Sequence, residues 1–205
     1  MKRIGVLGGA FDPPHLAHVA MAQAALQQLK LNELQIFPTG QAWHKAQALS
    51  PASDRLAMCK LAFAGMAKVV VNPAELQRSG PTYTVETLRA MALEHPQAQL
   101  FLIIGQDQAR ALPSWYQIDE IVQKAIIWIV ERDVGPGNAT KSLSGNPDTE
   151  PQGLVIPTQT LKLPRLAHSA TEVRDLVAKG LSIDALVPQD VARYIHTHHL
   201  YQPAR

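Results

Sequence analysis

Short apolar runs alternate with longer segments of helical periodicity along most of this chain, and this alternation limits the folds open to it. The expected strands cover residues 4–7, 34–37, 69–71, 100–104, 126–130 and 154–156. The expected helices cover residues 16–29, 53–64, 85–94, 118–123, 170–179 and 188–197. Strands separated by helices form βαβ units, whose strands are parallel and whose crossovers are right-handed. The sequence therefore predicts an α/β fold: a doubly wound, mostly parallel sheet covered on both faces, with a small C-terminal helical part.

Length and composition indicate one globular domain. The 205 residues, 46% hydrophobic and 18% charged, suit a single domain over residues 1–205, with residues 165–205 as a helical subdomain. A formal net charge of +2 argues against nucleic acid or an anionic membrane as partner. The single cysteine, Cys59, excludes an internal disulfide and is expected in the core. No apolar stretch has the length of a membrane span or a signal core, so we expect a soluble, cytoplasmic protein.

The carboxyl ends of the strands are the first place to look for a ligand, because open α/β sheets bind ligands there. The segments that follow the expected strands are residues 8–12, 38–44, 105–107 and 131–133. Residues 135–152, rich in Gly, Pro, Ser, Asn and Thr, are interpreted as a loop or insertion.

A distinctive motif follows the first strand. Gly8-Gly9 lets the backbone approach a ligand closely, and Pro13-Pro14 leads into a helix. A helix N-terminus offers unpaired N–H groups and partial positive charge, which bind phosphate. His15 and His18 stand three apart at this helix start, so both imidazoles face the same anion and can donate to it. The motif is neither a Walker A loop nor a dinucleotide Gly-x-Gly-x-x-Gly turn, yet it predicts a nucleotide-phosphate site.

The histidine pair has two other interpretations. A single histidine at a helix start is often structural, but two in phase behind a Gly-Gly turn argue against that. A metal site would need Asp12 as a third ligand beside His15 and His18. The surrounding glycines and helix start favour an anion over a cation.

The segment from Gly8 to His18 resembles the Gly-Gly-x-Phe-x-Pro-x-His-x-Gly-His signature of the nucleotidyltransferase superfamily. A second superfamily signature, Ile-Ser-x-Thr-x-x-Arg, is resembled by the segment from His168 to Arg174. Ser169 also suits a helix N-cap with Glu172 at the capping-box position. The resemblance implies a Rossmann-like nucleotidyltransferase fold and a site for ATP. The ATP-binding residues it implies are Gly8, Gly9, Ala10, Phe11, His15, His18, Gly105, Asp107, Ser169, Thr171 and Arg174.

The middle of the chain is similar to the bacterial nicotinate-nucleotide adenylyltransferases. The similar segments are 38–40 with 44–45, 81–88, 104–107 and 115–116. This resemblance implies adenylyl transfer from ATP, with Mg²⁺, to nicotinate mononucleotide, giving deamido-NAD and pyrophosphate. The residues implied for nicotinate mononucleotide are Gly40, His44, Lys45, Thr84, Trp115, Tyr116 and Arg132, and no protein ligand of a metal is assigned. Trp115 would stack on the pyridine ring, and Thr84 with the Tyr116 backbone would hold the carboxylate.

The implied chemistry needs no general base, because a phosphate monoester is already ionised near pH 7. The enzyme aligns two phosphates and stabilises the charge of the transition state, for which His15, His18 and Arg174 are the expected catalytic residues. Without the resemblance, core packing would account for Trp115 and helix capping for Thr84.

Some residues depart from the family pattern or compete as sites. Ala10 removes a hydroxyl, and Ala17, Trp43 and His168 also differ from the signature. The histidines at positions 196, 198 and 199 resemble a metal tract, but we expect a solvated helix end, where His suits the negative dipole. Rival functions are a phosphopantetheine or nicotinamide-mononucleotide adenylyltransferase with the same ATP half, and a nucleotide-sensing module that lacks catalysis.

Overall fold

A parallel β-sheet dominates the computed structural model, which describes residues 1–40, 49–132, 156–163 and 168–203, with only the backbone of Glu131 and Arg132. Within these ranges, six strands pair in the order β3-β2-β1-β4-β5-β6, and every pairing is parallel. The strands are β1 (Arg3–Gly9), β2 (Glu33–Pro38), β3 (Val69–Val71), β4 (Gln99–Gly105), β5 (Ala125–Arg132) and β6 (Thr158–Leu163). The predicted doubly wound α/β fold is confirmed.

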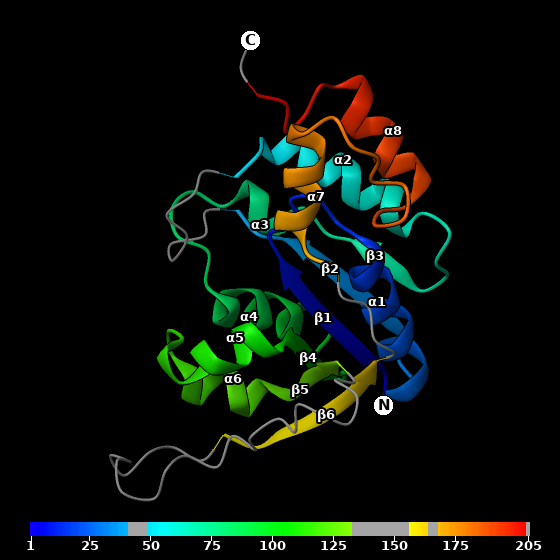
Figure 1. Ribbon diagram of the computed structural model, residues 1–205. Coiled ribbons are helices and arrows are strands. Elements are labelled where there is room, and N and C mark those ends of the chain that lie inside the picture. Colours follow the sequence, from blue (N-terminus) through cyan, green and yellow to red (C-terminus); the bar gives the residue numbers. More distant parts are fainter. Residues whose placement is uncertain (41–48, 133–155, 164–167, 204–205) are drawn as a thin grey trace, which may run out of the picture.

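Helices connect and cover the strands (Figure 1). They are α1 (Leu16–Gln28), α2 (Ala52–Phe63), α3 (Ala74–Gln77), α4 (Thr84–Glu94), α5 (Gln106–Ala111), the 3₁₀ turn η1 (Leu112–Ser114), α6 (Ile118–Lys124), α7 (Ala170–Ala178) and α8 (Gln189–Thr197). The six expected helices are all present, with ends within two residues of the prediction. The short α3, α5 and η1 were not expected, because a turn or two of helix carries no readable periodicity.

Two apolar layers pack against opposite faces of the sheet. On one face, Ile4 and Val6 of β1 join a cluster with Val85, Leu88 and Met91 of α4. On the other face, the cluster joins strand side chains to α1, α2, α7 and α8. Because successive strand residues point to opposite faces, a strand buried on both sides is apolar throughout. Apolar runs such as residues 100–104 therefore predict the positions of the strands from the sequence.

The sixth strand lies later in the chain than predicted. The expected strand at 154–156 falls mainly outside the described residues, and Ile156 itself is not in a strand. Instead, Thr158–Leu163 forms β6 at the edge of the sheet, beside β5. Its first three residues are exposed, and Leu161 and Leu163 are buried. An edge strand with one half-covered face has no apolar run, which is why hydrophobicity alone misplaced it.

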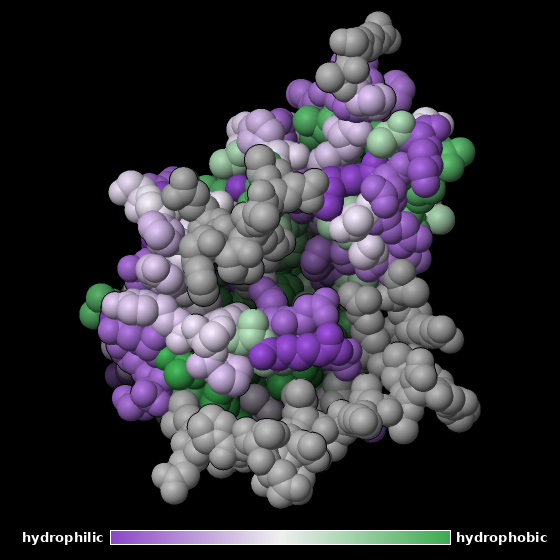
Figure 2. Space-filling view, turned by 60° about the vertical axis from the view of Figure 1, so that its left-hand side comes forward, coloured by the Kyte–Doolittle hydropathy of each residue, from purple (hydrophilic) through white to green (hydrophobic). Residues whose placement is uncertain are grey.

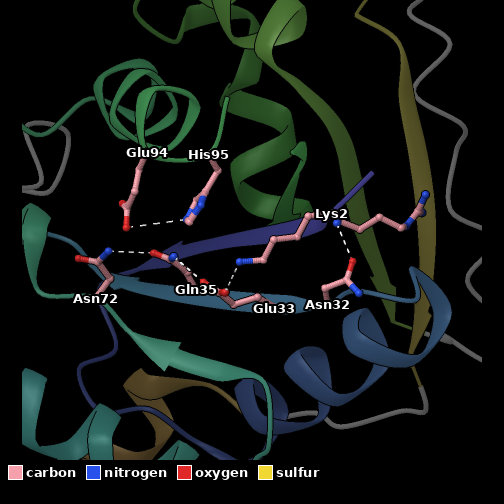
Figure 3. A network of polar contacts seen from close by, with 8 residues as sticks. Lys2, Asn32, Glu33, Gln35, Asn72, Glu94 and His95 are labelled. Carbon is pink, nitrogen blue, oxygen red and sulfur yellow. Dashed lines mark hydrogen bonds and ion pairs between the residues drawn. The ribbon is translucent and has the colours of Figure 1, made fainter. Parts of the chain in front are cut away.

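A polar network crosses the face of β2 near the end of α4 (Figure 3). The buried Gln35 donates to Glu33 at 2.7 Å and accepts from Asn72 at 2.8 Å. Lys2 donates to Glu33 at 2.8 Å, and this contact is the main reason why the pKa of Glu33 is lowered. The amide of Gln35 is thus satisfied on both sides, which allows a polar residue inside an otherwise apolar strand.

The C-terminal segment packs over the sheet near α2. In Figure 1, α8 lies beside α2, and α7 lies over the end of β1. The histidines at 196, 198 and 199 are exposed at the end of α8, which confirms the expected solvated helix end. Cys59 is fully buried, as expected, and burial raises the pKa of its thiol. No helix in the described ranges is long and apolar enough to cross a membrane.

Candidate active site

A pocket opens at the carboxyl edge of the sheet, where the sequence placed the ligand. Its apolar floor comes from β1, β4 and α6, and its polar wall from the segments after β2 and before α4. The lining residues are Val6, Gly8, Thr39, Glu75, Thr82, Tyr83, Thr84, Leu102, Ile104, Gln108, Trp115, Tyr116 and Ile121. Figure 2 shows a hollow with hydrophobic residues inside it on the face turned toward this edge. An apolar cavity with a few polar groups suits a small molecule with an aromatic ring.

The turn after β1 brings the predicted histidines together beside this edge. His15 is the N-cap of α1, and the rings of His15 and His18 stack with their centroids 3.8 Å apart. A Cβ on Gly8 would meet no atom of the described chain within 4 Å, although Gly8 lines the pocket. The glycine therefore leaves room for a ligand rather than for the chain's own packing.

The position of the proton on His18 follows from a backbone contact. The N–H of His15 donates to Nδ1 of His18 at 3.2 Å. A neutral imidazole has one donor and one acceptor nitrogen, so this bond assigns the proton to Nε2. His18 can then donate from Nε2, the ring nitrogen suited to meet a phosphate oxygen.

The structure adds one detail to the predicted phosphate site. The N–H of Leu16, the first residue of α1, donates to the carbonyl of Leu186 at 2.8 Å. The C-terminal segment thus occupies one of the helix N–H groups that the sequence assigned to phosphate. Local periodicity could not reveal this, because Leu186 is distant in the sequence.

The second predicted anchor, at the start of α7, reaches the same turn. Ser169 caps α7 by accepting from the N–H of Glu172 at 3.1 Å, as expected. Arg174 donates to the carbonyl of Asp12 at 2.8 Å and to the hydroxyl of Thr171 at 3.2 Å. A guanidinium carries five N–H donors, so these contacts hold Arg174 beside the turn and leave donors for an anion.

The alternative metal site around Asp12 is not present. The Asp12 carboxylate accepts from the Ser50 N–H at 3.0 Å and from the Tyr201 hydroxyl at 2.6 Å. Among the described residues, no group of three or more His, Cys, Asp or Glu side chains could hold an ion. Asp12 instead joins the turn to two other parts of the chain.

The sequence analysis missed a buried cation beside the turn. Arg55, only 2% exposed, donates to the carbonyls of Ala10 at 3.0 Å, Thr39 at 2.7 Å and Ser50 at 3.0 Å. Burial is the main cause that lowers its pKa, and the charge of Asp12 opposes it. The turn after β1 and the two described ends of the connection from β2 to α2 therefore meet on one guanidinium. The sequence did hold one sign of this buried cation, because Arg55 stands at helical spacing from the apolar residues of α2.

Of the residues expected for nicotinate mononucleotide, Thr84, Trp115 and Tyr116 line the pocket. Thr84 begins α4, and Tyr83 rather than Thr84 is the N-cap, so helix capping does not account for Thr84. Trp115 packs partly against the apolar core and also lines the pocket. Beside it, the ring of Tyr116 lies 4.6 Å from that of Tyr83. These positions suit stacking on a planar ring and holding its substituent.

Two further residues shape the wall of the pocket. A Cβ on Gly40 would lie 2.3 Å from the carbonyl oxygen of Glu75, so only glycine fits there. The Thr82 hydroxyl is buried in the wall with no hydrogen-bond partner among the described residues. A buried hydroxyl of this kind can be satisfied by a ligand atom.

Other predicted residues lie elsewhere or outside the described part. Asp107, in α5, has a side chain 97% exposed and lies 3.5 Å from Arg110. Gly105 ends β4 and is the N-cap of α5. The positions of His44, Lys45 and Trp43, and the side chain of Arg132, lie outside the described residues, as do the loop at 135–152 and most of 41–50.

A buried carboxyl group, Glu75, also lines the pocket. Its Oε1 accepts from the Thr87 hydroxyl at 2.7 Å, and Arg78 donates to the same hydroxyl at 2.8 Å. Burial raises the pKa of Glu75 from 4.5 to about 7, although Thr87 and Arg78 oppose this change. The folded protein therefore binds a proton at Glu75 more tightly than the unfolded chain does.

We expect Glu75→Gln to raise the free energy of unfolding at pH 8 and to leave it nearly unchanged at pH 4.5. Stability from this group falls as pH rises between 4.5 and about 7, since ionisation is costly only in the folded state. The gain at pH 8 is about 3 kcal/mol. Urea unfolding at both pH values measures it, with the exposed Glu94→Gln as control. An equal change at both pH values would contradict the assignment.

A parallel sheet with a glycine turn, two stacked histidines and an arginine at its carboxyl edge defines the class of nucleotidyltransferases. Residues 6–176 match the family model described as cytidylyltransferase-like. A relative from Albidiferax ferrireducens, described as a probable nicotinate-nucleotide adenylyltransferase, is 51% identical over 100% of both chains. A relative from Bordetella avium with the same description is 38% identical, also over 100% of both. The chain belongs to the cytidylyltransferase-like family and, within it, to the nicotinate-nucleotide adenylyltransferases.

Solved structures agree with this fold. The Plasmodium falciparum nicotinic acid mononucleotide adenylyltransferase complexed with NaAD aligns with a TM-score of 0.73 at 22% identity, covering 98% of each chain. A structure described as a putative nicotinate-nucleotide adenylyltransferase from Vibrio parahaemolyticus aligns with a TM-score of 0.69 at 16% identity, covering 100% of this chain and 98% of the other. The family and the Rossmann-like fold expected from the motifs are confirmed.

Proposed function

We propose that this protein transfers the adenylyl group of ATP to nicotinate mononucleotide, releasing pyrophosphate and forming deamido-NAD, a step of NAD biosynthesis. The observation that carries the proposal is the full-length relationship to adenylyltransferases of this description. The pocket supports it, because an aromatic and hydroxyl-lined cavity lies beside the turn with the paired histidines.

The nicotinate half binds in the pocket. Trp115 stacks on the pyridine ring, and the Thr84 hydroxyl with the N–H groups of Thr84 and Tyr116 holds the carboxylate. An amide in place of the carboxylate would turn its NH₂ toward these donors and leave both unpaired. Gly40 allows Thr39 and Glu75 to close the wall. His44, Lys45 and Arg132 complete the proposed set for nicotinate mononucleotide.

The ATP half binds along the turn after β1 and the start of α7. Its proposed residues are Gly8, Gly9, Ala10, Phe11, His15, His18, Gly105, Asp107, Ser169, Thr171 and Arg174. The phosphate of nicotinate mononucleotide attacks the α-phosphorus of ATP, a P–O bond forms, and the bond to pyrophosphate breaks. His18, through Nε2, and Arg174 hold the phosphate oxygens as charge develops, and His15 supports His18 by stacking.

We propose that Mg²⁺ would be carried by the triphosphate, where it would supply charge neutralisation, rather than by protein side chains. This would suit a cation that keeps much of its hydration. This fits the described residues, because the Asp12 carboxylate is already engaged with Ser50 and Tyr201. We further propose a cytoplasmic enzyme, since it consumes ATP, with residues 1–205 forming one domain and 165–205 its helical subdomain.

Pyrophosphate release from ATP with nicotinate mononucleotide tests the proposal directly. We expect turnover with nicotinate mononucleotide and far slower turnover with nicotinamide mononucleotide or phosphopantetheine. Preference for either of the other acceptors would replace the proposed substrate. ATP binding without pyrophosphate release would instead indicate a nucleotide sensor.

Thr84→Val removes the hydroxyl and keeps the shape of the side chain. We expect KM for nicotinate mononucleotide to rise about tenfold, because a hydrogen bond to a charged group is lost. KM for nicotinamide mononucleotide changes little, so selectivity falls. Steady-state kinetics with both substrates measures this, and Thr160→Val, exposed on β6, is the matched control. Equal changes in KM for both substrates would remove Thr84 from carboxylate recognition.

A further inference from the structure

Tyr201, near the C-terminal end of the described residues, contacts the turn after β1. The hydroxyl of Tyr201 donates to Oδ1 of Asp12 at 2.6 Å, across 189 residues of sequence. Asp12 is only 5% exposed. Burial, followed by the bond to Asp12, raises the pKa of Tyr201 well above its ordinary value, so its hydroxyl keeps its proton at neutral pH. The contact is therefore a charge-assisted hydrogen bond in a dry environment.

The hydrogen bond from Tyr201 is one of several that Asp12 accepts. Its Oδ2 accepts from the Ser50 N–H, and its carbonyl accepts from Arg174. Asp12 stands two residues after Ala10, whose carbonyl is held by Arg55. The turn that leads to the paired histidines is thus held by four residues, two of which, Arg174 and Tyr201, belong to the C-terminal segment.

The backbone near Tyr201 is shaped for this contact. His199 has φ +53° and Tyr201 has φ +62°, both in the left-handed region that side chains other than glycine rarely adopt. Such conformations persist where the surrounding contacts determine them. Here the hydrogen bond from Tyr201 to Asp12 is one of those contacts.

We propose that Tyr201 is a positioning residue for adenylyl transfer, acting through Asp12 to hold the turn and its histidines against the phosphates. The inference rests on the proposed function above. Tyr201 itself need not touch a substrate. Without this hydroxyl, the Asp12 carboxylate loses one of the two groups that donate hydrogen bonds to it. The turn then shifts relative to α7 and to the pocket.

The chain contains a matched control for this bond. The hydroxyl of Tyr194 donates to Oδ1 of Asp54 at 2.8 Å and links α8 to α2. Tyr194→Phe and Tyr201→Phe each remove one tyrosine–aspartate hydrogen bond from the C-terminal segment. Only the second bond reaches the turn after β1, so a merely structural role predicts the same outcome for both variants.

The test is steady-state kinetics on the full chain. We expect Tyr201→Phe to lower kcat about tenfold, since small misalignments of reacting groups cost large factors in rate. KM for ATP and for nicotinate mononucleotide stays within about twofold. Tyr194→Phe leaves kcat unchanged. A wild-type kcat in Tyr201→Phe, or equal losses in both variants, would overturn the proposal.

A double-mutant cycle tests whether the effect passes through Asp12. In an Asp12→Ala background, adding Tyr201→Phe should lower kcat no further, because the acceptor is already gone. Losses that multiply independently would show that Tyr201 acts by another route, against the proposal.

Hydrogen exchange separates this inference from the proposed function. The amides of residues 9–12 and of His15 should exchange faster in Tyr201→Phe than in wild type or Tyr194→Phe. If wild type releases no pyrophosphate, the proposed function fails, whereas the faster exchange would still support the contact's role in holding the turn. Unchanged exchange at these amides would overturn it.

Discussion

Replacing His18 by alanine is expected to lower kcat by about a hundredfold to a thousandfold, the usual cost of removing one donor to a developing oxyanion. KM for nicotinate mononucleotide should change little, because His18 is not among the residues that line the pocket. Rates of pyrophosphate release under saturating ATP and nicotinate mononucleotide measure the effect. Wild-type turnover in His18→Ala would remove the histidine from the mechanism.

The bond between the His15 N–H and Nδ1 of His18 makes a sharper comparison available. Asparagine at position 18 can keep an acceptor near Nδ1, whereas glutamine can place an N–H donor near Nε2. We therefore expect His18→Gln to recover part of the lost kcat and His18→Asn to remain as slow as His18→Ala. If asparagine restores the rate and glutamine does not, His18 serves the shape of the turn instead of the phosphate. His196→Ala, at the exposed end of α8, controls for general effects.

Arg55→Met is expected to lower the free energy of unfolding by about 3–5 kcal/mol, because three carbonyls lose a charged hydrogen-bond donor that is buried with them. The carbonyls of Ala10, Thr39 and Ser50 would lose their donor. The buried Asp12, whose charge opposes the lowering of the Arg55 pKa, would also lose its neighbouring cation. Urea unfolding monitored by circular dichroism measures the change.

Two further variants separate these contributions. Arg55→Lys keeps the charge, but a single ammonium cannot reach three separated carbonyls, so we expect an intermediate loss. Arg89→Met removes an arginine that pairs with Glu120 at the surface, and we expect it to change stability little. If Arg55→Met is no less stable than Arg89→Met, the two connections that Arg55 joins do not depend on it.

Adjacent residues of the sequence predict the ATP half of the site better than the nicotinate half. For ATP, Gly8, His15, His18 and Arg174 could be chosen because each belongs to a motif of adjacent residues. The structure brings them to one edge of the sheet. For nicotinate, only the resemblance to the adenylyltransferases predicted Thr84 and Trp115. The sequence around Thr84 suits helix capping as well as binding, and that around Trp115 suits core packing as well as binding.

The sequence by itself determined the features that depend on residues close to one another along the chain. Periodic burial marked five strands and six helices, and Ser169 marked the start of α7. An edge strand such as β6, half exposed and without an apolar run, escaped the same reasoning.

Only the tertiary structure decided how distant segments support the turn after β1. Arg55 donates to carbonyls of two connections, Leu186 accepts from the first N–H of α1, and Tyr201 reaches Asp12 across 189 residues. Hydrogen bonds of this kind depend on where the chain returns after folding, and no local periodicity encodes that. Adjacent residues therefore predict the chemistry of the turn, whereas its rigidity comes from residues that contact it only in the folded protein.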